Sequence, residues 1–490
     1  MDPKENPPRK IVPIVAVNDA PDAGDEVKMV SLYEATQKIY PRSVHGIFAK
    51  WRWIMVFLTQ LVFYGLPWLN WNGRQAVLFD LTARKFYIFG VVLWPQDFVY
   101  LAALLIISAY SLFLFTAIFG RVWCGFTCPQ TVYTEIFMWI ERKIEGSRSA
   151  RIRLDRQTTS FNKLSRKTAK HIVWGAVALW TGFTFVGYFT PIHFLSTEVM
   201  ALTLGPWEWF WVLFYSFATY GNAGWMREQV CKYMCPYARF QSAMFDKDSL
   251  IVTYDSQRGE PRGAHIKAET TTETTADKKL GDCIDCSLCV QVCPTGIDIR
   301  KGLQYECIGC AACIDACNTV MDKVGSPRGL IRYWTEHAML GRWSSAQILR
   351  HTLRPRVLIY SAVLFVIVSV FFGTLLTRTP FKMDVIRDRG AMGREVENGM
   401  IENVYRLQIM NTDEDVHHFR LSVSGLDGIR LDGVAEEIEL GSTESRAVPV
   451  RVRVDAGVGQ KGSNKIWFNL QVTDGDELQI KEKAVFFIPR

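Results

Sequence analysis

Two cysteine runs with identical spacing constrain this chain more than any other feature. The first run holds Cys283, Cys286, Cys289 and Cys293, and the second holds Cys307, Cys310, Cys313 and Cys317. Both read C-x₂-C-x₂-C-x₃-C, which is the ligand spacing of domains that hold two 4Fe–4S clusters. Three thiolates two residues apart can wrap one face of a cluster, and the fourth cysteine of each run serves the other cluster.

This exchange of the fourth cysteine predicts the ligands of both clusters. One set is Cys283, Cys286, Cys289 and Cys317, and the other is Cys293, Cys307, Cys310 and Cys313. Zinc sites usually use four ligands in two close pairs, and disulfides need an oxidising compartment. We therefore expect a ferredoxin domain of the bacterial two-cluster type. The second run departs from the usual pattern, because Asn318 stands where a Pro is common.

The overall composition indicates a membrane protein. Aromatic residues make up 13% of the chain, 16 of them Trp, and the net charge is only +7. This balance fits basic cytoplasmic loops better than nucleic-acid binding, and nucleic acid is not an expected partner. All 12 cysteines belong to motifs, so none is left for a disulfide framework.

Five apolar runs are long enough to be predicted as membrane-spanning helices. They cover residues 53–73, 98–119, 171–190, 207–225 and 357–377. Residues 86–94 are apolar but too short to cross, so we expect an interfacial or re-entrant segment there. Residues 1–50 have no apolar stretch behind a basic start, and we expect a cytoplasmic tail rather than a signal peptide.

The distribution of Lys and Arg predicts the orientation of these spans. The connection between the second and third spans is rich in both residues, whereas residues 191–206 contain neither. Arg350, Arg354 and Arg356 precede the fifth span. We therefore expect a bacterial inner-membrane protein with a cytoplasmic N-terminus, cytoplasmic cysteines and a periplasmic C-terminus. The cytoplasm keeps thiols reduced, so the orientation agrees with the cluster prediction.

These features divide the chain into five parts. They are a tail over 1–50, a four-span region over 51–246, a cytoplasmic ferredoxin domain over 247–340, a fifth span over 357–377 and a periplasmic domain over 381–490. A linker rich in Thr, Glu and Lys, residues 269–279, leads to the first cysteine run. The last part alternates apolar and polar residues between turn signals such as Asp432-Gly433 and Asp474-Gly475, which predicts an antiparallel β-sandwich.

A shorter repeat accounts for the other four cysteines. It occurs after the second and the fourth predicted spans, as Cys124-Gly-Phe-Thr-Cys128-Pro129 and Cys231-Lys-Tyr-Met-Cys235-Pro236. Pro is tolerated in the first turn of a helix and disfavours helical geometry in the residue before it. We therefore predict helices that begin at both prolines, with Cys128 and Cys235 as N-caps. A helix N-terminus should lower the pKa of these thiols.

Each C-x₃-C-P motif offers two thiols at the expected cytoplasmic membrane surface. Soft thiolates select Cu(I), zinc or iron–sulfur centres, and two thiolates suit linear Cu(I). Met234 could add a thioether. The alternatives are buried structural cysteines or a redox disulfide, and the repetition of the same spacing favours a metal. The sequence leaves open whether the two motifs form one metal site or two.

Taken together, these features resemble the CcoG/FixG/RdxA family of accessory proteins for cbb3-type cytochrome c oxidase. The resemblance rests on both kinds of cysteine motif, the fifth span, the β domain and the segments 120–131 and 325–333. It implies a membrane-bound polyferredoxin with an immunoglobulin-like periplasmic domain, which reduces Cu(II) to Cu(I) for the oxidase's haem–copper centre. The eight cysteines of the two runs match the family's cluster ligands. Its proposed copper motif matches Cys124, Cys128, Cys231 and Cys235.

The leading hypothesis is an inner-membrane copper reductase and assembly factor, with the C-x₃-C-P cysteines as its catalytic residues. It would take electrons from an unidentified cytoplasmic donor and pass Cu(I) to a copper transporter or chaperone and to oxidase subunits. One rival is a quinol-linked electron-transfer subunit for a periplasmic reductase, which would need a quinone or haem site. No C-x-x-C-H haem signature occurs. A second rival is a non-enzymatic scaffold. The oligomeric state stays open between a monomer and a homo-oligomer.

Overall fold

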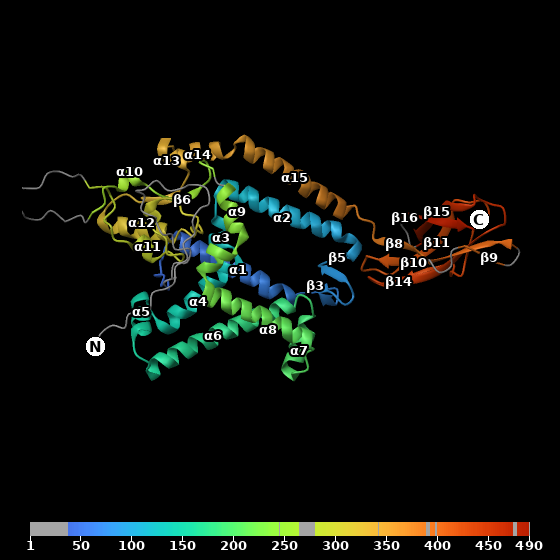
Figure 1. Ribbon diagram of the computed structural model, residues 1–490, viewed down its shortest axis with the longest axis horizontal. Coiled ribbons are helices and arrows are strands. Elements are labelled where there is room, and N and C mark those ends of the chain that lie inside the picture. Colours follow the sequence, from blue (N-terminus) through green and yellow to red (C-terminus); the bar gives the residue numbers. More distant parts are fainter. Residues whose placement is uncertain are drawn as a thin grey trace, which may run out of the picture.

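The structure is a computed structural model that describes residues 38–489, apart from 245, 264–279, 342, 389–392, 397–398 and 474–477. The linker expected at 269–279, the turn at 474–475 and most of the N-terminal tail lie outside these residues. The molecule is elongated, with a β domain at one end, the cysteine-rich domain toward the other and long helices between them (Figure 1).

Two long apolar helices lie side by side in the middle of the molecule (Figure 1). They are α2 (Phe98–Phe119) and α15 (Pro355–Leu376), each 22 residues long. The Tyr100 hydroxyl donates a hydrogen bond to the Thr374 carbonyl at 3.1 Å. In the part of the chain that the structure describes, these are the two helices long and apolar enough to cross a membrane. Their apolar side chains are largely exposed, as expected of helices that face lipid.

The other three predicted spans do not meet this criterion, so the five-span bundle is not confirmed. Helix α1 (Ile47–Gly65) starts earlier than expected, includes Lys50 and Arg52, and ends before residues 69–73. Helix α6 (Phe161–Val186) starts in a basic segment. Helix α8 (Pro206–Tyr220) has 15 residues. At 1.5 Å per residue this α-helical part is about 22 Å long, and the π-helix η3 (Gly221–Met226) continues it directly.

Helices α6 and α8 nevertheless pack closely against each other. Gly182 of α6 lies so near the backbone of Val212 in α8 that a Cβ atom would not fit. Shorter helical segments complete this region. They are η1 (Leu66–Trp68), η2 (Pro95–Asp97), α3 (Val122–Phe126), α4 (Pro129–Glu145), α5 (Arg148–Arg156), α7 (Ile192–Ala201), the π-helices η3 (Gly221–Met226) and η4 (Val230–Met234), and α9 (Pro236–Met244).

Residues 86–94 form strands, not the expected interfacial or re-entrant segment. Strands β3 (Val77–Asp80), β4 (Lys85–Ile88) and β5 (Val91–Leu93) make an antiparallel sheet, preceded by the β1 (Asn70–Trp71) and β2 (Arg74–Gln75) pair. The Arg74 guanidinium pairs with Glu414 of the β domain at 2.5 Å. The Lys85 ammonium donates to the Thr443 carbonyl at 2.8 Å. This small sheet therefore joins the helical region to the β domain.

The cysteine-rich domain is closed by two strands from its two ends. Strand β6 (Ile251–Tyr254) pairs antiparallel with β7 (Ile331–Trp334). Between them lie α10 (Ser256–Gly259), α11 (Leu288–Gln291), η5 (Ile299–Lys301) and α12 (Ala312–Val324). The core contains Val252, Ile314, Met321 and Leu330, packed beside the cysteines. Helices α13 (Glu336–Gly341) and α14 (Ser345–Thr352) then lead to α15.

The C-terminal domain is the predicted antiparallel sandwich. One sheet has the order β12-β14-β10-β8, with β9 also paired to β10, and the other has the order β13-β11-β15-β16. Tyr405, Leu407 and Ile409 alternate inward along β10, and Phe468 and Phe486 reach them from the other sheet. The strands are β8 (Phe381–Arg387), β9 (Arg394–Glu395), β10 (Ile401–Asn411), β11 (His417–Ser424), β12 (Arg430–Asp432), β13 (Ile438–Leu440), β14 (Ser445–Val454), β15 (Gly462–Val472) and β16 (Gln479–Ile488).

Candidate metal centre

The first expected ligand set lines one small cavity in the cysteine-rich domain. The cavity is bordered by Cys283, Cys286, Cys289 and Cys317. Cys283 and Cys286 belong to the loop that runs into α11, Cys289 lies in α11, and Cys317 is on α12. Asp285 and Ser287 both have a φ of 51°, a left-handed conformation that is unfavourable for residues other than glycine. These two bends curl the loop around the cavity.

The second expected set lines a neighbouring cavity. It is bordered by Cys293, Cys307, Cys310 and Cys313. Gly309 and Ala311 take the left-handed conformation here, with φ values of 66° and 57°. Cys289 borders both cavities, so the two share a wall. The structure therefore groups the eight cysteines as their spacing suggested, and their role as cluster ligands stays a prediction.

The chemistry of both cavities fits an iron–sulfur cluster. Each presents its four expected thiols, and the second also the shared Cys289, among mostly apolar neighbours such as Ile299 and Met321. Burial raises the pKa of Cys289 to about 11, and that of Cys307 and Cys317 to about 12. Without metal these thiols are neutral at physiological pH. Metal binding must displace their protons, which is the usual coupling in thiolate sites.

Both C-x₃-C-P motifs begin a helix where the sequence predicted one. Cys128 is the N-cap of α4, and α9 begins directly after Cys235. The prediction of a lowered thiol pKa is wrong for Cys128, because burial raises its pKa and outweighs the backbone hydrogen bonds at the helix N-terminus. Burial also raises the pKa of Cys124 to about 12 and that of Cys231 to about 11. The helix N-terminus alone therefore does not produce a thiolate.

The two motifs adjoin each other. Cys124 and Cys231 pack against the same apolar cluster. Cys128 lies near enough to raise the pKa of both thiols, and Cys235 acts on Cys128 and Cys231 in the same way. Among the described residues, no three His, Cys, Asp or Glu side chains are placed to hold a single metal ion. A two-coordinate ion such as Cu(I) needs only two thiolates. Met234, the expected thioether, is 57% exposed.

The first motif lies directly against the second cysteine cavity. A Cβ atom on Gly125 would be 2.7 Å from the Gly309 carbonyl oxygen and 2.8 Å from Cys310 Cα. The two backbones are thus in contact, which only a glycine permits. Arg121 is buried and donates hydrogen bonds to the Tyr305 and Ala238 carbonyls. It therefore ties the end of α2 both to the cluster loop and to α9.

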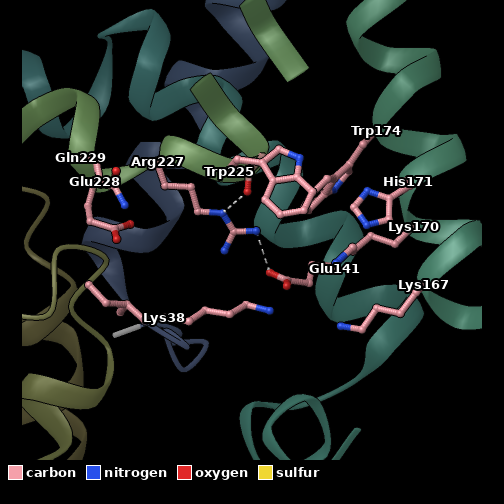
Figure 2. Close-up of a pocket in the computed structure, with 12 residues that line it drawn as sticks. Lys38, Glu141, Lys167, Lys170, His171, Trp174, Trp225, Arg227, Glu228 and Gln229 are labelled. Atoms are coloured by element: carbon pink, nitrogen blue, oxygen red, sulfur yellow. Dashed lines mark hydrogen bonds and ion pairs between the residues drawn. The ribbon is translucent and has the colours of Figure 1, made fainter. Parts of the chain in front are cut away.

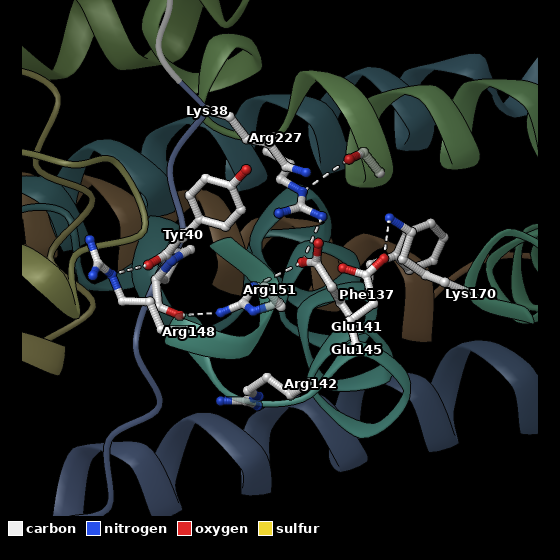
Figure 3. Close-up of polar contacts among 12 residues, drawn as sticks. Lys38, Tyr40, Phe137, Glu141, Arg142, Glu145, Arg148, Arg151, Lys170 and Arg227 are labelled. Carbon is white, nitrogen blue, oxygen red and sulfur yellow. Dashed lines mark hydrogen bonds and ion pairs between the residues drawn. The ribbon is translucent and has the colours of Figure 1, made fainter. Parts of the chain in front are cut away.

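A buried ion-pair network fixes α4 beside these motifs (Figure 3). Glu141 pairs with Arg151 and with Arg227, both at 3.1 Å, and Figure 3 shows both guanidinium groups directed at its carboxylate. The side chains of Glu141 and Arg151 are each 1% exposed. Burial opposes ionisation of Glu141, but Arg227 and Arg151 outweigh it and hold the pKa of Glu141 below its usual range. The network joins α4 to α5 and to the second repeat.

Sequence reasoning did not identify several of these contacts. Gln130 donates to the Asn222 carbonyl at 2.9 Å and to the Arg227 carbonyl at 3.1 Å, which links the two repeats. The Cys124 thiol donates to Gln241 at 3.4 Å. The sequence did contain one signal for such contacts, the Arg that precedes each C-x₃-C-P motif. A charged residue at the end of an apolar run needs a partner. Nothing in the sequence alone indicated that Gly125 contacts the cluster loop.

Known proteins similar to this chain identify its family. Nitrogen fixation protein FixG of Rhizobium meliloti is 37% identical over 481 residues, which cover 90% of this chain and 91% of FixG. The chain belongs to the FixG/RdxA family. Protein RdxA and Protein RdxB of Cereibacter sphaeroides are 40% and 39% identical to it. Those alignments cover 81% and 80% of this chain, and 85% and 83% of the relatives.

Three family models match separate parts of this FixG/RdxA chain. A 4Fe-4S dicluster domain matches residues 226–336, and a 4Fe-4S binding domain matches residues 101–146. An IG-like fold at the C-terminal of FixG matches residues 371–489. A crystal structure of a FixG-related protein from Vibrio parahaemolyticus is 26% identical, covers 23% of this chain and 99% of its own, and has a TM-score of 0.21. The expected family, 4Fe–4S dicluster domain and immunoglobulin-like domain are thus confirmed. The second 4Fe-4S match, which includes Cys124 and Cys128, was not expected from the sequence.

Proposed function

We propose that this FixG/RdxA protein is an inner-membrane iron–sulfur protein that reduces Cu(II) to Cu(I) for the haem–copper centre of cbb3-type cytochrome c oxidase. The main support is the contact of Gly125 with the backbone of Gly309 and Cys310. Cys124 precedes Gly125, and Cys310 borders the second cysteine cavity. An electron therefore has only covalent bonds and one van der Waals contact to cross between the two sites.

The residues of the C-x₃-C-P site suit copper as the substrate. When bound, two 4Fe–4S clusters supply one-electron storage and transfer. Cu(II) gains one electron and becomes Cu(I), while Cys124 and Cys231 lose their protons and bind it as thiolates. Thiolate ligation favours Cu(I) over Cu(II). Arg121 assists, because its positive charge counters the raised pKa of both thiols.

The proposal includes an orientation and partners. The N-terminus and the cysteines face the cytoplasm, where an unidentified donor supplies electrons, and the β domain faces the periplasm. A copper transporter or chaperone takes the Cu(I), and oxidase subunits are its destination. The Lys and Arg residues around the cysteine-bearing ends of the helices support this orientation.

The test uses the full-length, cluster-loaded protein and a Cys124→Ser/Cys231→Ser variant. Reduced clusters are titrated with Cu(II) without oxygen, while EPR follows the clusters and a chelator reports Cu(I). The wild type should form one Cu(I) for each electron lost. The variant should keep its cluster spectrum, react at least about tenfold more slowly and retain no Cu(I). Met200→Ala, at a side chain 88% exposed on α7, is the control and should match the wild type. Normal Cu(I) retention by the double variant would exclude the site.

A further inference from the structure

A separate cavity of about 420 Å³ lies between α4, the basic end of α6 and η3 (Figure 2). Its charged lining residues are Lys38, Lys167, Lys170 and Arg227, with Glu141 and Glu228. None of the twelve cysteines lines it. The ends of the four cationic side chains come from the N-terminal segment, α6 and η3, and Figure 2 shows them around one open space.

Cations outnumber carboxylates around this cavity. The pairs are Arg151 and Arg227 with Glu141, Lys167 and Lys170 with Glu145, and Lys38 and Lys167 with Asp155. Arg151, Glu145 and Asp155 do not line the cavity itself. Its lining holds four cations and two carboxylates, an excess of two positive charges. Burial raises the pKa of Glu228 and so opposes its ionisation. The cavity wall carries net positive charge.

Rigid contacts hold two of these cations in place. Trp174 is 2% exposed, and its indole NH donates to the Phe137 carbonyl at 3.1 Å. Lys170 Nζ lies 4.6 Å and Arg227 Cζ lies 5.4 Å from the Trp174 ring centroid. Arg227 also donates to the Gly224 carbonyl and to Glu141. Its other terminal nitrogen makes no hydrogen bond to a described residue and points into the cavity (Figure 2).

We propose that this cavity binds the phosphate group of an anionic ligand at the membrane surface. A carboxylate pairs with two cations here, whereas a phosphate has more charge and more acceptor oxygens and can bridge all three wall elements. Guanidinium and ammonium groups are the side chains that recognise phosphate. Trp225, 66% exposed and stacked on His171, stands at the rim, as aromatic side chains do at membrane interfaces.

Two sources share this chemistry: the headgroup of an anionic phospholipid and a soluble phosphate ester. Basic pockets between helix ends commonly hold lipid headgroups. Delipidated full-length protein in a neutral detergent distinguishes the sources. Equilibrium dialysis measures binding of labelled inorganic phosphate, and native mass spectrometry counts bound phosphatidylglycerol against phosphatidylcholine. Saturable phosphate binding identifies a soluble source, and retention of phosphatidylglycerol alone identifies the lipid. The site is independent of the copper proposal.

Matched variants test the position of the site. Lys38→Gln/Lys167→Gln removes two cavity cations, and Lys163→Gln/Arg166→Gln removes two cations of α6 that do not line the cavity. The first variant should bind the anion about tenfold more weakly, and the second like the wild type. If the Lys38→Gln/Lys167→Gln variant does not fold, Lys38→Gln alone replaces it in the binding test, because the Lys38 side chain is 49% exposed. Equal weakening in both double variants, or no binding of either probe to the wild type, overturns the proposal.

Discussion

Gly125 is the residue at which the first C-x₃-C-P motif meets the cluster loop, and the proposed electron route depends on this contact. In Gly125→Ala the added methyl would meet the Gly309 carbonyl oxygen at 2.7 Å, so the two backbones must separate. We expect electron transfer from the reduced clusters to Cu(II) to slow severalfold, with a loss of about 1–3 kcal/mol in stability from overpacking. Stopped-flow absorbance of the reduced clusters measures the rate.

Gly175→Ala is the matched control, because no atom lies within 4 Å of a Cβ placed at Gly175. It should leave the rate unchanged. If Gly125→Ala keeps both its clusters and the wild-type rate of electron transfer to Cu(II), electrons do not pass through the contact with the cluster loop.

Glu141 is expected to contribute more to stability than Glu135, a less deeply buried carboxylate of α4. Glu141→Gln leaves Arg151 and Arg227 buried without their shared counter-ion, and breaking such a buried pair costs about 3–5 kcal/mol. Glu135→Gln, at a looser 3.5 Å pair with a carboxylate that is 12% exposed, should cost less. Denaturant unfolding in detergent provides both values.

The pH dependence of this effect has a definite sign. The folded-state pKa of Glu141 lies below its ordinary value of 4.5, so the stabilisation is complete above that pH and is lost as the pH falls toward the folded-state pKa. The difference in free energy of unfolding between the wild type and Glu141→Gln should therefore become smaller as the pH falls. A constant difference from pH 7 down to pH 4 would contradict the stabilising role of ionised Glu141.

At the level of elements, local sequence chemistry located some helices well and others poorly. Pro129 and Pro236 start helices as predicted, because proline acts on its own residue and the one before it. The early start of α1 at Ile47 could not be predicted. Its cap is Asp315 on α12, more than 260 residues away, whose carboxylate accepts from the Ala49 backbone NH at 2.8 Å. Strands β3 to β5 were missed for a different reason. They pair with one another, but the apolar run 86–94 was interpreted only by its length against a membrane span.

This distant cap yields a prediction about α1 and α12. Asp315→Ala should cost about 1 kcal/mol and speed amide exchange in the first turn of α1, because the Phe48 and Ala49 amides lose their acceptor. Asp322→Ala is the control on α12, where the aspartate pairs with Arg328 at the surface. Hydrogen–deuterium exchange resolves the two regions. Equal exchange in both variants would show that α1 does not depend on the cap.

For the whole molecule, motif spacing was informative about ligand grouping but not about how the sites assemble. The spacing rule sorted the eight ferredoxin cysteines into the two groups that line the two cavities. The meeting of the two C-x₃-C-P motifs depends on tertiary contacts such as Gln130 with the Arg227 carbonyl. No rule of local geometry specifies these contacts. The sequence alone therefore could not decide whether the two motifs form one metal site or two.

The link between the helical region and the β domain should depend on Asp97. This carboxylate is 2% exposed and pairs with Arg378, in the junction between α15 and β8, at 2.9 Å, and with Lys382 at the start of β8. Asp97→Asn keeps an acceptor for the Trp94 NH but removes the charge that both cations share. A loss of about 1–2 kcal/mol would raise the population of the open junction about 5- to 30-fold. Trypsin should then cut after Arg378 and Lys382 faster by a similar factor.

The control is Asp80→Asn, at a residue in a turn of the β3–β4 hairpin, and it should leave cleavage unchanged. Unchanged cleavage in Asp97→Asn would show that the junction does not depend on this carboxylate.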